Sequence, residues 1–186
     1  MAVFVGARDL SGVPIGTHQF IVLTGQHLLE ERTVGTISVK AKSLGGGTFG
    51  LVVGAHNRGH LAVKFFEEAD HEAALEHFGG KKVKWYSSDF DAEFHTVDFG
   101  NTPEKVATDL VLFRINAFMI NQSLDKIAYP TLGLGFNSNS WAQSVIAYSS
   151  GKVTGNFRGL DYAHARKIPR TYFEPVCTVK PRPRVN

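Results

Sequence analysis

The chain has 186 residues, of which 43% are hydrophobic and 20% charged, with a formal net charge of +3. These values exclude a disordered polymer and predict a single globular domain over residues 1–186, large enough to fold without metals or disulfides. Its one cysteine, Cys177, excludes an intramolecular disulfide, and no apolar run reaches the roughly 20 residues of a membrane span, so membrane insertion is not expected.

The first hundred residues predict mostly strands. Residues 17–23 are rich in β-branched and aromatic side chains and end at the turn pair Thr24-Gly25. The side chains of residues 33–41 alternate in type from one position to the next, which predicts one half-buried strand. The glycines at 45–47 predict a loop. Similar patterns predict the remaining strands at 49–53, 60–66, 82–86 and 93–97. The N-terminal residues lack a secretory signal pattern, so we expect synthesis in the cytoplasm.

Residues 67–78 predict a short helix that ends at Gly79-Gly80 and exposes a charged surface. His71 and His77 both lie on it, but a spacing of six positions puts them on different faces of a helix. We therefore predict no metal site there, and nothing else in the sequence predicts a cofactor.

The strongest helical pattern runs from residue 103 to about 124. Thr102 is the predicted N-cap, and Pro103 suits the first turn because its missing N–H is not needed there. Apolar side chains recur at spacings of four and three, which predicts a stripe packed in the core: Val106, Leu110, Phe113, Ala117 and Ile120.

Another helix is predicted from near Asn139 to a stop at Gly151, opened by a polar turn. A nucleophile at such a helix start, here Ser138, has its anion stabilised by free backbone N–H groups. A histidine on a neighbouring strand is a suitable base, and His18 lies at the start of the strand predicted over residues 17–23.

The stretch Asn-Ser-Asn-Ser-Trp at residues 137–141 resembles the Asn-Cys-Asn-[Ser/Thr]-aromatic signature of circularly permuted papain-like enzymes. These include PPPDE isopeptidases, LRAT-like acyltransferases and permuted NlpC-type cell-wall peptidases. In that group the catalytic His comes first, shortly after a Gly, as His18 does here after Gly16. The resemblance covers only these short stretches. It implies an α+β, permuted papain-like fold with an antiparallel sheet packed against a long helix and the nucleophile-bearing helix.

The resemblance also implies site residues. The nucleophile is position 138 and the base His18, with Asn137, Asn139 and Ser140 near the substrate or oxyanion. A third group should come from the strand beside the histidine strand: His60, with His56 or no third residue as the alternatives. Residues 45–93 exceed a minimal core of this type and are expected to be an insertion, and residues 175–186 an extended tail.

The family nucleophile is Cys, whereas this chain has Ser138. An inactivating Cys-to-Ser change, a natural serine enzyme and a relative that has lost activity all remain open. A serine hydroxyl depends wholly on its base, whereas a thiolate forms readily at a helix start.

The function implied is hydrolysis of amide or peptide bonds, by a peptidoglycan peptidase or amidase that acts as a bacterial effector toxin. Such a toxin would reach a target cell's periplasm through a specialised secretion system and would have an immunity protein. The alternatives are an isopeptidase, deamidase or acyltransferase acting on a protein or lipid, or an inactive binding module. The basic residues from Arg166 to Arg184 lack interleaved stacking aromatics, so no nucleic-acid partner is predicted.

Overall fold

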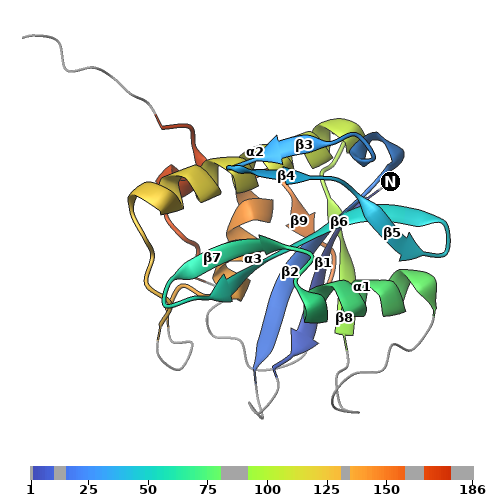
Figure 1. Cartoon of the computed structure of the whole chain (residues 1–186), viewed down its shortest axis with the longest axis horizontal. Coiled ribbons are helices and arrows are strands. Elements are labelled where there is room, and N and C mark those ends of the chain that lie inside the picture. Colours follow the sequence, from blue (N-terminus) through green and yellow to red (C-terminus); the bar gives the residue numbers. More distant parts are fainter. Residues whose placement is uncertain (1, 11–15, 81–91, 131–134, 158–165, 177–186) are drawn as a thin grey trace, which may run out of the picture.

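The computed structural model of the chain describes residues 2–10, 16–80, 92–130, 135–157 and 166–176. Its architecture is α+β, with one antiparallel seven-stranded sheet in the order β5-β6-β2-β1-β8-β9 and β7 paired to β6 (Figure 1). The strands of this sheet are β1 (Val3–Asp9), β2 (Thr17–Thr24), β5 (Lys42–Gly45), β6 (Thr48–Asn57), β7 (Leu61–Phe65), β8 (Ala92–Asp98) and β9 (Lys152–Val153).

Helices cover both faces of this sheet. The remaining elements are η1 (Gln26–Leu28), β3 (Arg32–Val34), β4 (Ile37–Val39), α1 (Glu68–Gly79), α2 (Glu104–Leu124), α3 (Ser138–Tyr148) and η3 (Arg170–Phe173). In Figure 1, α1 lies in front of β1 and β8. On that face Phe20 and Val22 pack in one apolar cluster with the alanines of α1, whereas Ile21 and Leu23 belong to the larger core with α2 and α3. The side chains of successive residues of β2 therefore point to opposite faces of the sheet.

Most of the predicted elements are confirmed within a few residues, including the three helices and the strands at 17–23, 49–53, 60–66 and 93–97. The single strand predicted at 33–41 is wrong. Gly35 has a φ of 64° and turns the chain between β3 and β4, which pair with each other as a hairpin. The strand predicted at 82–86 and the tail from 177 onwards lie outside the described residues.

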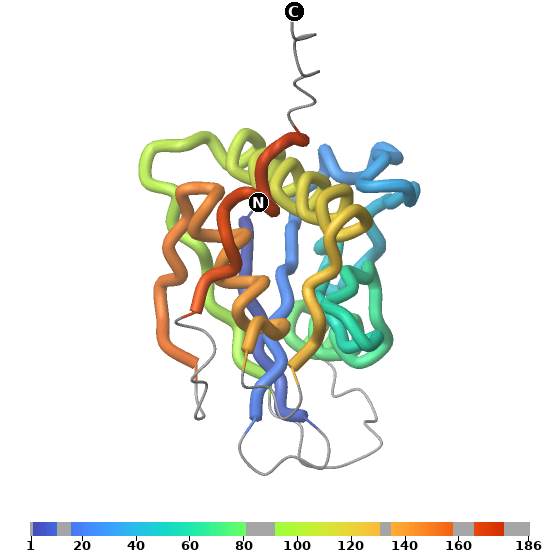
Figure 2. The backbone as a smooth tube through the Cα atoms, turned by 90° about the vertical axis from the view of Figure 1, so that its left-hand side faces the viewer, coloured from blue at the N-terminus to red at the C-terminus, as the bar shows by residue number. Residues whose placement is uncertain are grey.

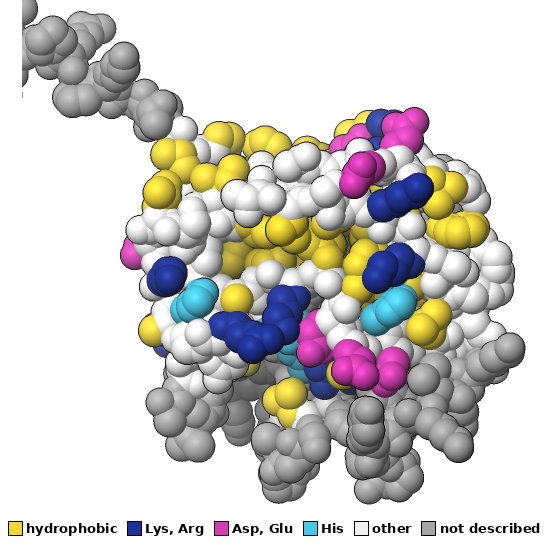
Figure 3. Space-filling view, viewed as in Figure 1, with side chains coloured by type: hydrophobic (Ala, Val, Ile, Leu, Met, Phe, Trp, Pro, Cys, Tyr) yellow, Lys and Arg dark blue, Asp and Glu magenta, His cyan; other side chains and the backbone are white. Residues whose placement is uncertain are grey.

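The buried face of α2 differs from the predicted stripe. Val106, Phe113 and Ile120 are 47%, 43% and 41% exposed. Ala117 of the predicted stripe is buried as expected, but the adjacent row of the helix packs in the core: Ala107, Val111, Ile115 and Phe118. Figure 3 shows hydrophobic side chains along the upper edge of the molecule, where α2 lies. Both rows are apolar, so periodicity alone does not decide which one is covered.

The ends and exposure of the helices also differ from expectation. Pro103, not Thr102, is the N-cap of α2, and it provides no side-chain hydrogen bond. The predicted stop of α1 is confirmed, because Gly80 caps it in the left-handed conformation with a φ of 64°. However, α1 is not simply an exposed charged helix, since Asp70, Ala73 and Ala74 are buried.

The C-terminal described segment packs against α2. Asn121 Nδ2 donates to the carbonyl groups of Thr171, Tyr172 and Glu174 at 3.3, 3.0 and 2.8 Å. Figure 2 shows this segment in red beside the yellow part of α2. Among the described residues, no helix combines the length and apolar character needed to cross a membrane.

Candidate functional site

A cluster of buried polar side chains lies between the sheet and α1. His18, on β2, directs Nε2 to Asp70 Oδ2 at 3.1 Å, and Arg8, on β1, donates from Nε to Asp70 Oδ1 at 2.7 Å. Asp70 is 1% exposed and His18 3%. The strand register explains why the basic groups meet, because Arg8 pairs with His18 across β1 and β2 and both project to the same face.

These contacts determine the protonation of His18. Burial acts to raise the pKa of Asp70, but His18, His56 and Arg8 outweigh it and hold the pKa well below its usual range. Burial lowers the pKa of His18, and Asp70 offsets only part of that effect. At neutral pH, Asp70 is thus a carboxylate and His18 a neutral imidazole. Since an ionised carboxylate only accepts hydrogen bonds, the His18 proton lies on Nε2 and its lone pair on Nδ1.

His56, on β6, is the second histidine of the cluster. Its Nε2 lies 3.1 Å from Asp70 Oδ2, and its ring centroid lies 4.6 Å from that of His18. This nitrogen is buried, yet within the described part of the chain it makes no hydrogen bond. His56 therefore contacts the same carboxylate oxygen as His18 without being satisfied by it.

The start of α3 is set by Asn137. Its side-chain oxygen accepts from the backbone N–H groups of Asn139 and Ser140, each at 3.0 Å. This is N-capping, which uses two of the free amides of the first turn. The backbone N–H of Ser138 is the first-turn amide that the Asn137 side chain leaves for another acceptor, such as an oxyanion.

Asn139 joins the start of α3 to the strand that carries His18. Its Oδ1 accepts from Gln19 N at 2.7 Å, and its Nδ2 donates to Thr17 O at 2.8 Å. These two backbone groups flank His18. The strand β6 pairs with β2 only from Phe20 to Thr24, so beyond that point Asn139 occupies the edge that β6 has left. The amide side chain of Asn139 thereby fixes the start of α3 against β2.

Ser138 and His18 are close in the fold but are not hydrogen-bonded. Ser138 Oγ donates to Asn139 Oδ1 at 3.3 Å, and in the described part of the chain no hydrogen bond joins it to His18. Gln143 of α3 donates to Gln19 Oε1 at 2.8 Å, so Gln19 faces α3 and His18 faces α1. The two residues thus lie on either side of the free edge of β2, linked through Asn139.

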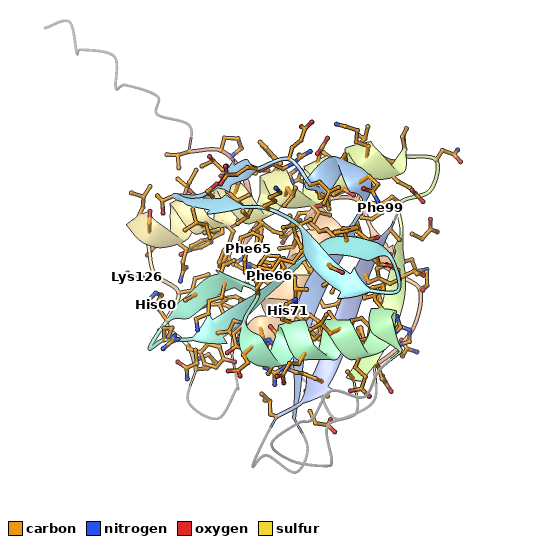
Figure 4. All side chains as sticks on the ribbon, turned by 45° about the vertical axis from the view of Figure 1, so that its right-hand side comes forward. His60, Phe65, Phe66, His71, Phe99 and Lys126 are labelled. Atoms are coloured by element: carbon orange, nitrogen blue, oxygen red, sulfur yellow. The ribbon has the colours of Figure 1, made fainter. Side chains whose placement is uncertain are left out.

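His60 lies elsewhere. It follows the end of β6, and its backbone bridges to Ala128. Figure 4 shows it beside Lys126, whereas His71 lies on α1 near Phe66. The structure therefore brings Asp70 and His56 to His18, and it does not bring His60 there.

A cavity of about 460 Å³ opens on the α3 face of the sheet. Gln19 and Gln143 line it together with the apolar side chains of Ile146 and Phe157, and two cations contribute to its wall, Lys152 and Lys167. Neither Ser138 nor His18 lines it. Gln19 lines the cavity, whereas the preceding residue, His18, faces the cluster on the other side of β2.

Sequence reasoning missed Arg8 and Asp70. Asp70 shares a helix face with Ala73 and Ala74 at spacings of three and four, which is the signal that this charged residue points inward. Arg8 interrupts an otherwise apolar strand, which is a similar signal. Neither signal identifies the partner, because the two residues are 62 positions apart.

Comparison with known proteins gives no match: no family model, no curated protein and no solved structure matches this chain.

Proposed function

We propose that the chain is a hydrolase of amide or peptide bonds with a permuted papain-like arrangement. Position 138 is the nucleophile, His18 its base, and Asp70 the residue that orients His18. The observation that carries the proposal is the buried hydrogen bond from His18 to Asp70, which leaves the Nδ1 lone pair of a neutral imidazole free. An imidazole oriented by a carboxylate is the usual partner of a hydroxyl or thiol nucleophile.

The chemistry follows the ordinary course of acyl transfer. The oxygen of Ser138, or a sulfur in its place, attacks the substrate carbonyl, and its proton passes to His18 Nδ1. His18 then gives this proton to the leaving amine as the C–N bond breaks. Water, activated in the same way, hydrolyses the acyl intermediate. In this proposal the Ser138 backbone N–H, at the start of α3, stabilises the oxyanion.

This chemistry requires a rotation of the Ser138 side chain. Ser138 Oγ must leave Asn139 Oδ1, to which it donates over a long 3.3 Å, and turn around the free edge of β2. Catalytic hydrogen bonds are often unformed before substrate binds, so their absence does not exclude the pair. Asn139 keeps the two elements in place during this rotation, because it is bonded to the backbone on both sides of His18.

The cavity supports a peptide as the substrate. Its paired glutamine amides suit backbone amide groups, and Lys152 and Lys167 suit carboxylates. The peptides of peptidoglycan offer both amides and carboxylates, so we propose them as the substrate class. In this proposal the chain acts as an antibacterial effector.

A second candidate is a binding module without catalysis. It is favoured by the observation that Ser138 is only 3% exposed and is bonded to Asn139 rather than to His18. In that case the polar cluster would serve only to fix the packing of α1 on the sheet.

Digestion of purified peptidoglycan separates the candidates. The Ser138→Cys protein should release new peptides or amines detectable by mass spectrometry, and adding His18→Ala to it should abolish this release. The unmodified chain controls for thiol chemistry elsewhere, because it already carries Cys177. Release that persists without His18 would contradict the proposed base. No release from any form would remove the cell wall as substrate and favour the binding module.

A further inference from the structure

Three potential metal ligands converge on one point of the buried cluster. His18 Nε2, His56 Nε2 and Asp70 Oδ2 come from β2, β6 and α1, and all lie within 4.8 Å of one another. Each histidine nitrogen lies 3.1 Å from the same carboxylate oxygen. His18 makes a hydrogen bond to it, whereas His56 Nε2 is a buried polar atom at this point that has no hydrogen-bond partner among the described residues.

The spacing of these atoms matches tetrahedral coordination. With metal–ligand distances of about 2.0–2.2 Å, neighbouring ligand atoms in a tetrahedron are about 3.4 Å apart. The two observed nitrogen–oxygen distances of 3.1 Å need to change by only about 0.3 Å to reach that value. Two of the three distances between ligand atoms are therefore close to those of an assembled site, and the third, between the two histidine nitrogens, is within 4.8 Å.

Gly54 leaves room for an ion among the ligands. A Cβ atom at this position would lie 2.6 Å from Asp70 Oδ2, 2.9 Å from His56 Nε2 and 3.2 Å from His18 Nε2. The three atoms thus surround a space that any other side chain at position 54 would fill. This accounts for a glycine in the middle of the buried strand β6, where it otherwise weakens the sheet.

We propose that His18, His56 and Asp70 bind a divalent transition metal, with zinc as the natural occupant. Two imidazole nitrogens and one carboxylate oxygen favour zinc, cobalt, nickel or copper over magnesium and calcium, which prefer oxygen ligands. Arg8 holds the other oxygen, Asp70 Oδ1, at 2.7 Å, in the manner of the outer partners that orient metal-binding carboxylates. Because the charge of Arg8 also offsets that of Asp70, the one negatively charged ligand, we expect a micromolar rather than picomolar affinity for zinc.

Zinc binding excludes catalysis by His18, and this part of the inference rests on the proposed function. A metal on Nε2 takes the lone pair of that nitrogen, so the one proton of the neutral imidazole moves to Nδ1. Nδ1 then has no lone pair to accept a proton from position 138. The ion and the base activity are mutually exclusive, so zinc is an inhibitor of the site.

Zinc titration in competition with a chromophoric chelator tests the metal site without any substrate. All forms carry Cys177→Ser, so that no thiol competes. We expect one zinc ion per chain, and we expect His56→Ala to weaken binding about 100-fold. His56 is 13% exposed at its side chain, so this variant should fold, and circular dichroism checks it. The matched control is His60→Ala, a substitution of the same type between β6 and β7 and outside the cluster, which should bind zinc as before.

Absence of zinc binding at micromolar concentration, or equal binding by His56→Ala, would overturn the metal site. Gly54→Ala gives an independent readout, because its methyl group should exclude zinc and also cobalt, whose visible spectrum reports coordination. Binding of cobalt by a folded Gly54→Ala chain would equally overturn the site.

The inhibitory role has its own test. Zinc should suppress peptidoglycan release by Ser138→Cys, and the zinc concentration that halves release should rise about 100-fold when His56→Ala is added. Release that is insensitive to bound zinc would refute the inhibition but leave the metal site standing. Zinc binding without any release from a chelator-treated sample would instead refute the proposed function.

Discussion

The helices α1 and α2 place their side chains in opposite ways. The helix α1 is rich in charge, yet it buries Asp70 at 1% exposure in contact with three basic side chains. The helix α2 is largely apolar, yet it leaves Val106 and Phe113 more than two-fifths exposed. Local composition establishes that a segment is helical, but the tertiary fold decides which face is covered. Two paired substitutions and one acidification experiment sharpen or break this comparison.

The largest effect is expected at Asp70. Asp70→Asn leaves Arg8 buried without its counter-charge, so we expect the free energy of unfolding to fall by about 3–5 kcal/mol. Glu72→Gln on the same helix is the control. Partial burial and the neighbouring Glu68 and Glu67 raise the pKa of Glu72, so loss of its charge should change stability by less than about 0.5 kcal/mol. Urea denaturation measures both, and equal effects would show that Asp70 is not the buried charge of α1.

Replacing an isoleucine by alanine on each face of α2 compares the contributions of the two faces to stability. Ile115 is fully buried and Ile120 is 41% exposed. We expect Ile115→Ala to cost about 2–5 kcal/mol and Ile120→Ala less than about 1 kcal/mol. Thermal or urea unfolding distinguishes them. If Ile120→Ala proved the costlier change, the stripe predicted from periodicity would be the true core face.

A smaller difference between α1 and α2 is expected in their loss of protection on acidification. Burial lowers the pKa values of His18, His71 and His77, all of which lie on α1 or beneath it, whereas α2 contains no histidine. Below a pH of about 6.5 the unfolded chain takes up protons that these folded residues do not, so stability is lost as pH falls. Hydrogen exchange, corrected for its intrinsic pH dependence, should show α1 losing protection between pH of about 7.5 and 5.5 more than α2 does. Equal loss in both helices would contradict this.

The sequence predicts those parts of the fold that depend on local patterns. Strands and helices follow from periodicity, and the end of α1 follows from its glycines. The hairpin of β3 and β4 was missed because one glycine with positive φ interrupts an alternating run. The covered face of α2 was missed because two adjacent rows of the helix are equally apolar.

The candidate site was predicted only in part, because its contacts also depend on the tertiary fold. His18 and Asn139 are 121 positions apart, and the expectation that their neighbourhoods meet came from the order of motifs, not from local physics. The structure joins these neighbourhoods through hydrogen bonds from Asn139 to the backbone beside His18. Asp70 could not be identified as the partner of His18, because this contact depends on how α1 packs across β2 and β6. His56 is an alternative in the sequence prediction, but its contact with the same carboxylate also requires that packing.

The central claim, that His18 serves a nucleophile at position 138, is tested most directly by the acidity of a thiol placed there. In Ser138→Cys with Cys177→Ser, the thiolate absorbance near 240 nm is followed against pH, with and without His18→Gln. Our account predicts a thiol pKa well below the ordinary value of about 8.5, and a rise of this pKa when His18 is replaced. A pKa at or above the ordinary value that does not respond to His18 would contradict it.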